Sequence, residues 1–237
     1  MNILRVSTLF LWFMAYSIFG WVYETILCSA LERKFVYRGF LNGPYCPIYG
    51  FGAVLDIMFL GKIENWFVLF LAGATLNCTL EYFTAWAMEK LFHAKWWDYS
   101  NMKFNIKGRV CLLGALVFGA FSVFLIKIAH PYVTSVTNRL SDILTYILSG
   151  VLAAAFFADL YITLEGFGDF DEKLRSFAED VIGARNKVKK HIADMPKRFN
   201  YQERRMLRAF PKLSSVRHND ALRELKQKLK ELAAERK

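Results

Sequence analysis

Residues 110–128 read VCLLGALVFGAFSVFLIKI, and this stretch decides the fold class. Its single charged side chain, Lys127, stands next to the end, where a long aliphatic stem can carry the ammonium group to water. A helix that crosses a bilayer needs about 20 mostly apolar residues. The stretch therefore predicts a membrane-spanning helix.

Four further segments of the chain have a similar character. They are residues 6–31, 45–61, 66–88 and 143–164. Together with residues 110–128 they predict an all-α polytopic membrane protein with about five transmembrane helices. The segment 45–61 is the least regular, because it is short and rich in Pro and Gly, and a re-entrant or broken helix there would change the topology.

The composition agrees with a membrane protein. Hydrophobic residues make up 55% of the 237 residues and charged residues 22%. These values exclude a conventional soluble enzyme, a disordered chain and a disulfide-rich secreted domain. The four cysteines lie far apart with no histidine at ligand spacing, so neither a zinc site nor a disulfide framework is expected. The first 30 residues lack the pattern of a cleavable signal.

Charge is concentrated in the C-terminal third of the chain. Residues 1–164 hold 12 Lys and Arg against 9 Asp and Glu, whereas residues 165–237 hold 19 against 12. We therefore expect a transmembrane domain over residues 1–165 and a basic, helical cytoplasmic tail over residues 166–237. The mixed charges of the tail are typical of a solvated helix surface and argue against binding of nucleic acid.

The basic residues also predict an orientation. Residues 32–44 hold three Lys and Arg, residues 89–109 hold five, and the tail holds nineteen. By the positive-inside rule these regions are cytoplasmic, which places the N-terminus outside and the C-terminus inside.

Helical spacing of apolar residues appears twice in the tail. Residues 169–195 show it, and the last stretch places four leucines three or four positions apart: Leu222, Leu225, Leu229 and Leu232. We expect helices that lie on the protein or on anionic lipid, with pairing to another helix as the alternative.

Four acidic residues fall inside the predicted spans. Glu24, Glu81 and Asp159 lie in the cytoplasmic halves of their spans, and Asp56 lies in an outer half. An ionised side chain at the middle of a bilayer costs about 2.5–3.5 kcal/mol, and such residues usually face the interior of the bundle. Two interpretations remain open: a shared polar site, or acids that each pair with a nearby Arg or Lys to hold the helices together.

Two loops supply candidate partners for these acids. Residues 38–50 read RGFLNGPYCPIYG, and residues 96–112 read WWDYSNMKFNIKGRVCL. Glycine and proline keep the first loop from forming an ordinary helix, so its backbone groups can bind a ligand. In both cases a span with a Glu leads through an Asn- and Gly-containing loop into the next span, which suggests a 2+2+1 repeat arrangement. The candidate substrate-binding residues are Glu24, Arg38, Asn42, Tyr45, Glu81, Asp98, Asn105 and Arg109.

These motifs are similar to those of a known family. The run YSIFGWVYE at residues 16–24, continued by residues 38–50, resembles the bacterial ABC-transporter type IV permease family. The later WDYS at residues 97–100 and NIKGRVCL at residues 105–112 resemble a second motif block of that family. The resemblance covers about residues 8–165 and leaves the tail outside. It implies a multi-pass transport protein of the bacterial cell membrane and carries over no functional residues.

The chain holds no G-x-x-x-x-G-K-[ST] phosphate-binding loop, so ATP-driven transport would need a separate ATPase subunit. We expect a permease-like transporter subunit with a polar site in the cytoplasmic half of the bundle. It would contact membrane lipid, be completed by a homo-oligomer or another partner, and use no cofactor, metal or nucleic acid.

The alternative is an intramembrane enzyme that acts on a lipid or isoprenoid-linked substrate at the inner leaflet. The paired acids, the two arginines and the thiol of Cys46 would then serve acid–base or phosphate-binding roles. The sequence shows no recognisable nucleophile–base pair and no metal constellation, so an enzyme is the less favoured interpretation.

Overall fold

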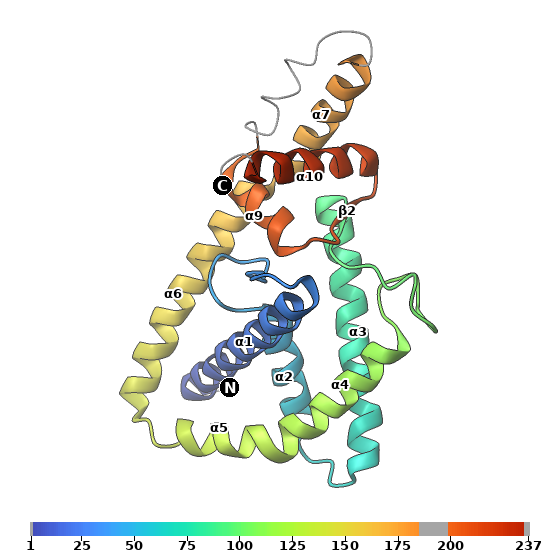
Figure 1. The fold of residues 1–237 in the computed structure, drawn as a ribbon. Coiled ribbons are helices and arrows are strands. Elements are labelled where there is room, and N and C mark those ends of the chain that lie inside the picture. Colours follow the sequence, from blue (N-terminus) through green and yellow to red (C-terminus); the bar gives the residue numbers. More distant parts are fainter. Residues whose placement is uncertain (1, 185–198, 235–237) are drawn as a thin grey trace. The chain divides into compact units, whose positions relative to one another are not determined.

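The computed structural model describes residues 2–184 and 199–234 of this chain. These residues are predominantly helical, with almost no sheet (Figure 1), which confirms the predicted all-α polytopic fold class. They form two compact units. The first consists of Met1–Thr84 and Asp98–Tyr161, and the second of Ala85–Trp97 and Ile162–Lys237.

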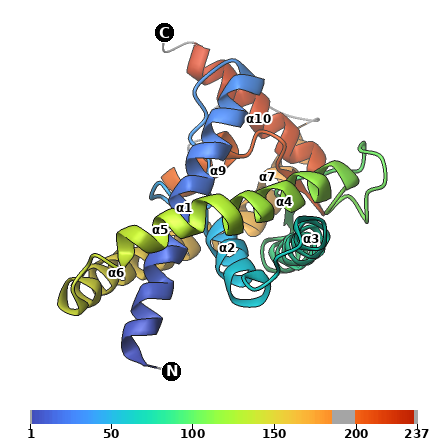
Figure 2. The same cartoon turned by 90° about the horizontal axis from the view of Figure 1, so that it is seen from below.

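The first unit holds the apolar helices. These elements are α1 (Ile3–Glu32), α2 (Pro47–Leu60), α3 (Trp66–Phe92), α4 (Leu112–Phe124), the π-helical turn η1 (Leu125–Ala129), α5 (His130–Thr137) and α6 (Asp142–Phe167). The chain reverses direction at each loop between α1, α2, α3 and α4, and again between α5 and α6 (Figure 1). Seen from below, α4, η1 and α5 follow one another in a continuous path that crosses α1 (Figure 2). At that crossing, hydrogen bonds join Trp12 to Thr137 and Tyr16 to His130.

In the part of the chain that the structure describes, four helical segments are long and apolar enough to cross a membrane. They are Ile3–Glu32, Trp66–Phe92, Leu112–Thr137 and Asp142–Glu179. The remaining predicted span, residues 45–61, corresponds to α2. Its 14 residues give a helix about 21 Å long, against a hydrocarbon core of about 30 Å. Passage of α2 through the whole membrane therefore stays a prediction, and so does the orientation with the N-terminus outside.

Helix α1 packs against α2 more extensively than any other pair of described elements does. Glycines allow this close approach. A Cβ atom on Gly20 would overlap the Tyr49 side chain, and one on Gly50 would overlap Ser17 and the Phe13 carbonyl. Small residues at such contacts let membrane helices approach closely enough to gain van der Waals contact and hydrogen bonds.

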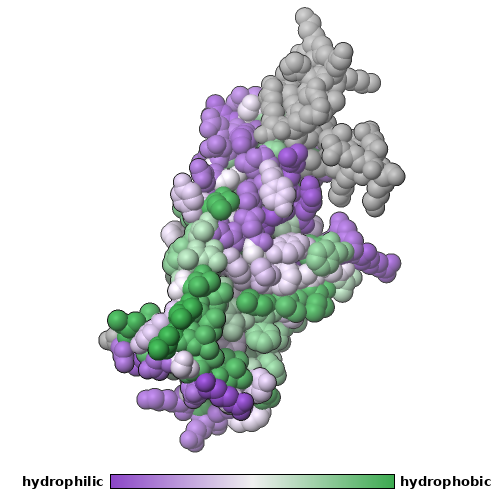
Figure 3. All heavy atoms as spheres, turned by 90° about the vertical axis from the view of Figure 1, so that its left-hand side faces the viewer, coloured by the Kyte–Doolittle hydropathy of each residue, from purple (hydrophilic) through white to green (hydrophobic). Residues whose placement is uncertain are grey.

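The apolar surface of α6 faces outward. Ile143, Ile147, Val151 and Phe157 are each more than half exposed. Figure 3 shows apolar side chains gathered in continuous areas on one face of the molecule. Exposure of this kind is expected of a helix whose solvent is lipid, since lipid tails are as apolar as the side chains.

The second unit has its own core. In addition to the ends of α3 and α6 it contains β1 (Ala94–Lys95), α7 (Phe170–Ala184), α9 (Tyr201–Ala209), β2 (Ser214–Ser215) and α10 (Asn219–Ala234). The two strands pair antiparallel, with Ala94 opposite Ser215. Its fully buried side chains include Phe167, Phe170, Leu174, Phe199, Met206, Leu222 and Leu225.

The second unit contains helices of the region predicted to form the tail. Helix α9 begins with a reciprocal cap, in which Asn200 and Glu203 exchange side chain to backbone hydrogen bonds, and Lys173 donates to Glu203 at 3.0 Å. The described part of the predicted helix 169–195 corresponds to α7; residues 185–195, and the side chains of Leu229 and Leu232, lie outside what the structure describes.

Candidate functional site

Glu24 lies at the centre of a polar cluster at the end of α1. Its Oε2 accepts two hydrogen bonds from Arg38, from Nε at 3.1 Å and from Nη2 at 3.0 Å. Its Oε1 accepts a hydrogen bond from the Tyr49 hydroxyl at 2.6 Å. The Cys28 thiol lies 3.9 Å from Oε2. Two of the predicted site residues, Glu24 and Arg38, thus form an ion pair that is largely shielded from solvent.

The path of the chain after α1 explains this pairing. Arg33 adopts a left-handed conformation (φ 51°) that ends the helix and turns the chain back. The Ser29 hydroxyl then accepts a hydrogen bond from the amide of Val36, and the Thr25 hydroxyl accepts one from the amide of Arg38. The loop is therefore held along the last turns of α1, and Arg38 arrives beside Glu24.

Glu81 on α3 is buried, with 7% of its surface exposed. Its Oε1 accepts a hydrogen bond from the Tyr99 hydroxyl at 3.1 Å, whereas its Oε2 is buried and has no hydrogen-bond partner among the described residues. Burial raises the pKa of the Tyr99 phenol, and the carboxylates of Glu81 and then Glu24 raise it further. Both carboxylates therefore act electrostatically on the same phenol.

Arg109 contacts Tyr82, the residue that follows Glu81 on α3. Its Nη1 donates to the Tyr82 hydroxyl at 2.9 Å, and its guanidinium carbon lies 5.0 Å from the centre of the Tyr82 ring. No ion pair joins Arg109 to Glu81 in the described residues.

Asp98 and Asn105 shape the loop that carries Tyr99 and Arg109. The Asp98 carboxylate accepts hydrogen bonds from the amide and hydroxyl of Ser100. The Asn105 side chain donates to the carbonyls of Ser100 and Met102 and accepts from the amide of Gly108 at 3.0 Å. These two predicted site residues thus make contacts within the loop itself.

Asn42 and Tyr45 meet Asp159 on α6. Oδ1 of Asp159 accepts from the amide and side chain of Asn42 at 3.0 and 2.7 Å, and Oδ2 accepts from the Gly43 amide at 2.8 Å and the Tyr45 hydroxyl at 2.6 Å. Burial and this carboxylate raise the pKa of Tyr45. Asp159, like Asp56, is not among the candidate substrate-binding residues. The amides of Asn42 and Gly43, in a loop that Gly and Pro keep from forming an ordinary helix, are the signal that could have indicated a carboxylate partner.

The fourth acid, Asp56, is 2% exposed and lies between helices. Asn77 of α3 donates to both of its carboxylate oxygens, at 3.0 and 3.1 Å, and also contacts Ser122 of α4. This network joins α2, α3 and α4, and it fits a role in helix packing.

Two observations bear on the chemistry that these groups can supply. Among the described residues there is no group of three or more His, Cys, Asp and Glu that could hold a metal ion. Burial raises the pKa of the Cys46 thiol to about 12, which keeps it protonated and makes it a poor nucleophile.

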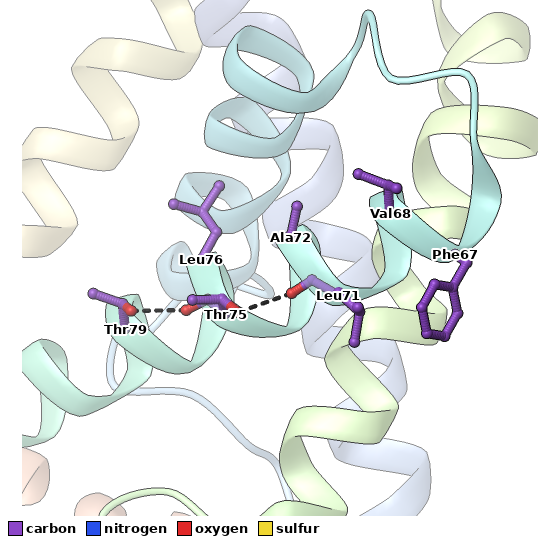
Figure 4. A pocket seen from close by; sticks show the side chains of 7 residues that line it. All are labelled: Phe67, Val68, Leu71, Ala72, Thr75, Leu76 and Thr79. Carbon is purple, nitrogen blue, oxygen red and sulfur yellow. Dashed lines mark hydrogen bonds between the residues drawn. The ribbon is translucent and has the colours of Figure 1, made fainter.

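A shallow groove lies away from these acids, on one face of α3 (Figure 4). Its lining consists of Phe67, Val68, Leu71, Ala72, Thr75, Leu76 and Thr79. The hydroxyls of Thr75 and Thr79 donate to carbonyls one turn earlier in the same helix, so the groove is apolar. It offers nothing to a polar solute.

The apolar part of the chain matches a known family. A family model described as "Putative ABC-transporter type IV" matches residues 11–164, more than half of the chain. The chain belongs to this family. The part that matches the ABC-transporter type IV model includes all four acids and both loops, and the C-terminal tail lies beyond it. Comparisons with curated proteins and with solved structures gave no match.

Proposed function

We propose that this chain is the membrane-spanning subunit of a transporter, and that Glu24, Arg38, Glu81 and Tyr99 form its solute-binding site. We place this site in the cytoplasmic half of the bundle, because the orientation predicted from Lys and Arg puts Glu24 and Glu81 there. The cell membrane of a bacterium is the expected location.

One observation carries the proposal. Oε2 of Glu81 is buried in an apolar bundle and has no partner among the described residues. An ionised group at this depth costs about 2.5–3.5 kcal/mol and, when it is not part of a structural pair, usually marks a solute or ion pathway. Asp56 and Asp159 differ from Glu81, since hydrogen bonds from the protein itself reach both of their oxygens.

The energy source would be a separate ATPase subunit. The sequence has no phosphate-binding loop of the Walker type, and the family name associates the chain with ABC transporters. The short α2 and the few spans also favour a pathway that a second copy or a partner completes.

Solute distribution tests the proposal. Cells that lack the gene are complemented with the wild-type chain, with Glu81→Gln, or with Glu64→Gln, a matched change at an exposed position in the turn before α3. We expect at least one small solute to differ between cell extract and medium when the wild type or Glu64→Gln is present, and Glu81→Gln to behave like the empty strain. A changed lipid profile with unchanged solute distribution would contradict transport and support the lipid-modifying enzyme.

A further inference from the structure

The charges of the site do not balance. Glu24 is neutralised by Arg38, which donates two hydrogen bonds to it. Glu81 has no ion pair among the described residues, and Arg109 donates a hydrogen bond to Tyr82. With Glu81 ionised, the group of Glu24, Arg38 and Glu81 would carry one net negative charge.

An uncompensated negative charge at this depth is costly, and the carboxylate of Glu24 adds repulsion. Two events relieve it: a proton on Oε2, or a cation beside Oε2. Oε2 can accept either the proton or the cation, because the hydrogen bond from Tyr99 goes to Oε1. The two events exclude each other, since both use the same oxygen.

The geometry points to Glu81 as a position that exchanges a proton for a cationic solute, so that the substrate class of this site is a monovalent cation. This inference rests on the proposed function. When the cation enters, the O–H bond of the Glu81 carboxyl breaks, the proton leaves to the medium, and the carboxylate holds the cation. We expect one positive charge on the solute, because it neutralises the one net negative charge of the site.

The surrounding groups are fixed or neutral during this exchange. Arg38 and Tyr49 hold the Glu24 carboxylate in place, so it stays a fixed negative charge that favours the cation. The Tyr99 phenol has a raised pKa and stays a hydrogen-bond donor. Two thiols also interact electrostatically here, Cys78 with Glu81 and Cys111 with Tyr99.

Proton release tests the exchange directly and needs no transport. The purified full chain is placed in lipid nanodiscs in weakly buffered medium with a pH indicator. Sodium, potassium and methylammonium chlorides are the probes, each replacing N-methylglucamine chloride at constant ionic strength. We expect at least one probe to release about one proton per chain from the wild type and from Glu64→Gln, and none from Glu81→Gln.

A second variant guards against a folding defect in Glu81→Gln. Tyr99→Phe keeps the carboxyl but removes the donor to Oε1, so the carboxylate form is less stabilised. Half-maximal release should then need about 3- to 10-fold more cation, the effect of one lost hydrogen bond. An unchanged midpoint would contradict the role given to Tyr99 in the exchange.

The proposal is overturned if none of the three probes releases protons from the wild type, or if Glu81→Gln releases as many as the wild type. Failure of the cation-exchange inference can be distinguished from failure of the transporter proposal. A Glu81-dependent solute distribution in cells, together with no proton release, would leave the transporter proposal standing and remove only the cationic substrate class.

Discussion

The guanidinium of Arg38 donates two hydrogen bonds to a single carboxylate oxygen of Glu24, at 3.1 Å from Nε and 3.0 Å from Nη2. The two residues are 14 positions apart, on α1 and on the loop that folds back along it. Tyr49 of α2 donates to the other oxygen, so both oxygens of Glu24 have partners from the protein. This pair ties the end of α1 to the loop and to the start of α2.

Breaking either half of this pair should be costly, and the costs of breaking the two halves should not add. Glu24→Gln or Arg38→Gln leaves a shielded partner without its counter-charge, and we expect each to lower the free energy of unfolding by about 1–3 kcal/mol. The double variant should lose less than the sum. Unfolding by SDS in mixed micelles measures these values. Glu32→Gln, which breaks the more exposed contact of Glu32 with Lys34, is the matched control and should cost under about 0.5 kcal/mol.

The carboxylate of Asp159 should stabilise the conformation of the loop at residues 38–50. Asp159→Asn replaces one acceptor oxygen with an amide donor, so either the Gly43 amide or the Asn42 amide loses its partner. We expect hydrogen exchange at these two amides to become about 10-fold faster, because each 1.4 kcal/mol of local stability is worth a factor of ten. Mass spectrometry of the loop peptide measures the rate.

Tyr45→Phe gives a graded version of the same test. It removes one donor to Asp159 and should accelerate exchange less than Asp159→Asn does. Tyr161→Phe, at an exposed position half a turn further along α6, is its control. Equal exchange in all four proteins would mean that the loop is held by other contacts.

Cys46 should resist alkylation at ordinary pH. Burial raises the pKa of its thiol from 9.0 to about 12, so at pH 8 the thiolate fraction is about a thousandfold lower than in an unfolded chain. Because the folded pKa is the higher one, this group's contribution to stability is complete below pH 9 and is lost as the pH rises from 9 to 12. Iodoacetamide labelling of the Cys46 peptide, compared before and after denaturation in SDS, measures the difference. Equal labelling rates in both states would disprove the protection.

Much of the helical architecture could be predicted from apolar runs. The predicted spans 6–31, 66–88 and 143–164 correspond to Ile3–Glu32, Trp66–Phe92 and Asp142–Phe167. The physical reason is that backbone groups in lipid must be bonded within the segment, which leaves the helix as the solution for an apolar run. Each helix extends past its apolar run, since helical hydrogen bonding continues into water without a change of pattern.

The partners of the acids could be predicted only in part. Arg38 follows Glu24 closely in sequence, so the proximity of the two was a fair hypothesis. The contact of Asp159 with Asn42 joins positions 117 residues apart, and helical periodicity carries no information about it. The same holds for Asp56 and Asn77. The four-residue spacing of Asn77 and Glu81 puts both on one face of a helix, but which helix that face meets depends on tertiary packing.

The second unit also lay beyond sequence reasoning. Its fully buried Phe167, Phe199 and Met206 come from separated segments, and residues 85–97 join them from another part of the chain. Amphipathic spacing predicted the helices of the tail, yet it could not say what their apolar faces meet.

The turn at residues 61–65 decides how many times the chain crosses the membrane. It follows α2, whose length of about 21 Å is less than the hydrocarbon core, and the chain reverses there (Figure 1). In the five-span arrangement this turn is external, and Lys127 donates to its Ile63 carbonyl at 2.8 Å. We therefore expect Glu64→Cys, in a chain without its native cysteines, to react with a membrane-impermeant maleimide in intact cells. Lys103→Cys, exposed in the loop before α4, should react only after the cells are opened, because that loop is predicted to be cytoplasmic. If Glu64→Cys reacts only in opened cells and Lys103→Cys reacts in intact cells, α2 enters and leaves on the cytoplasmic side, and the orientation of every later span is the reverse of the predicted one.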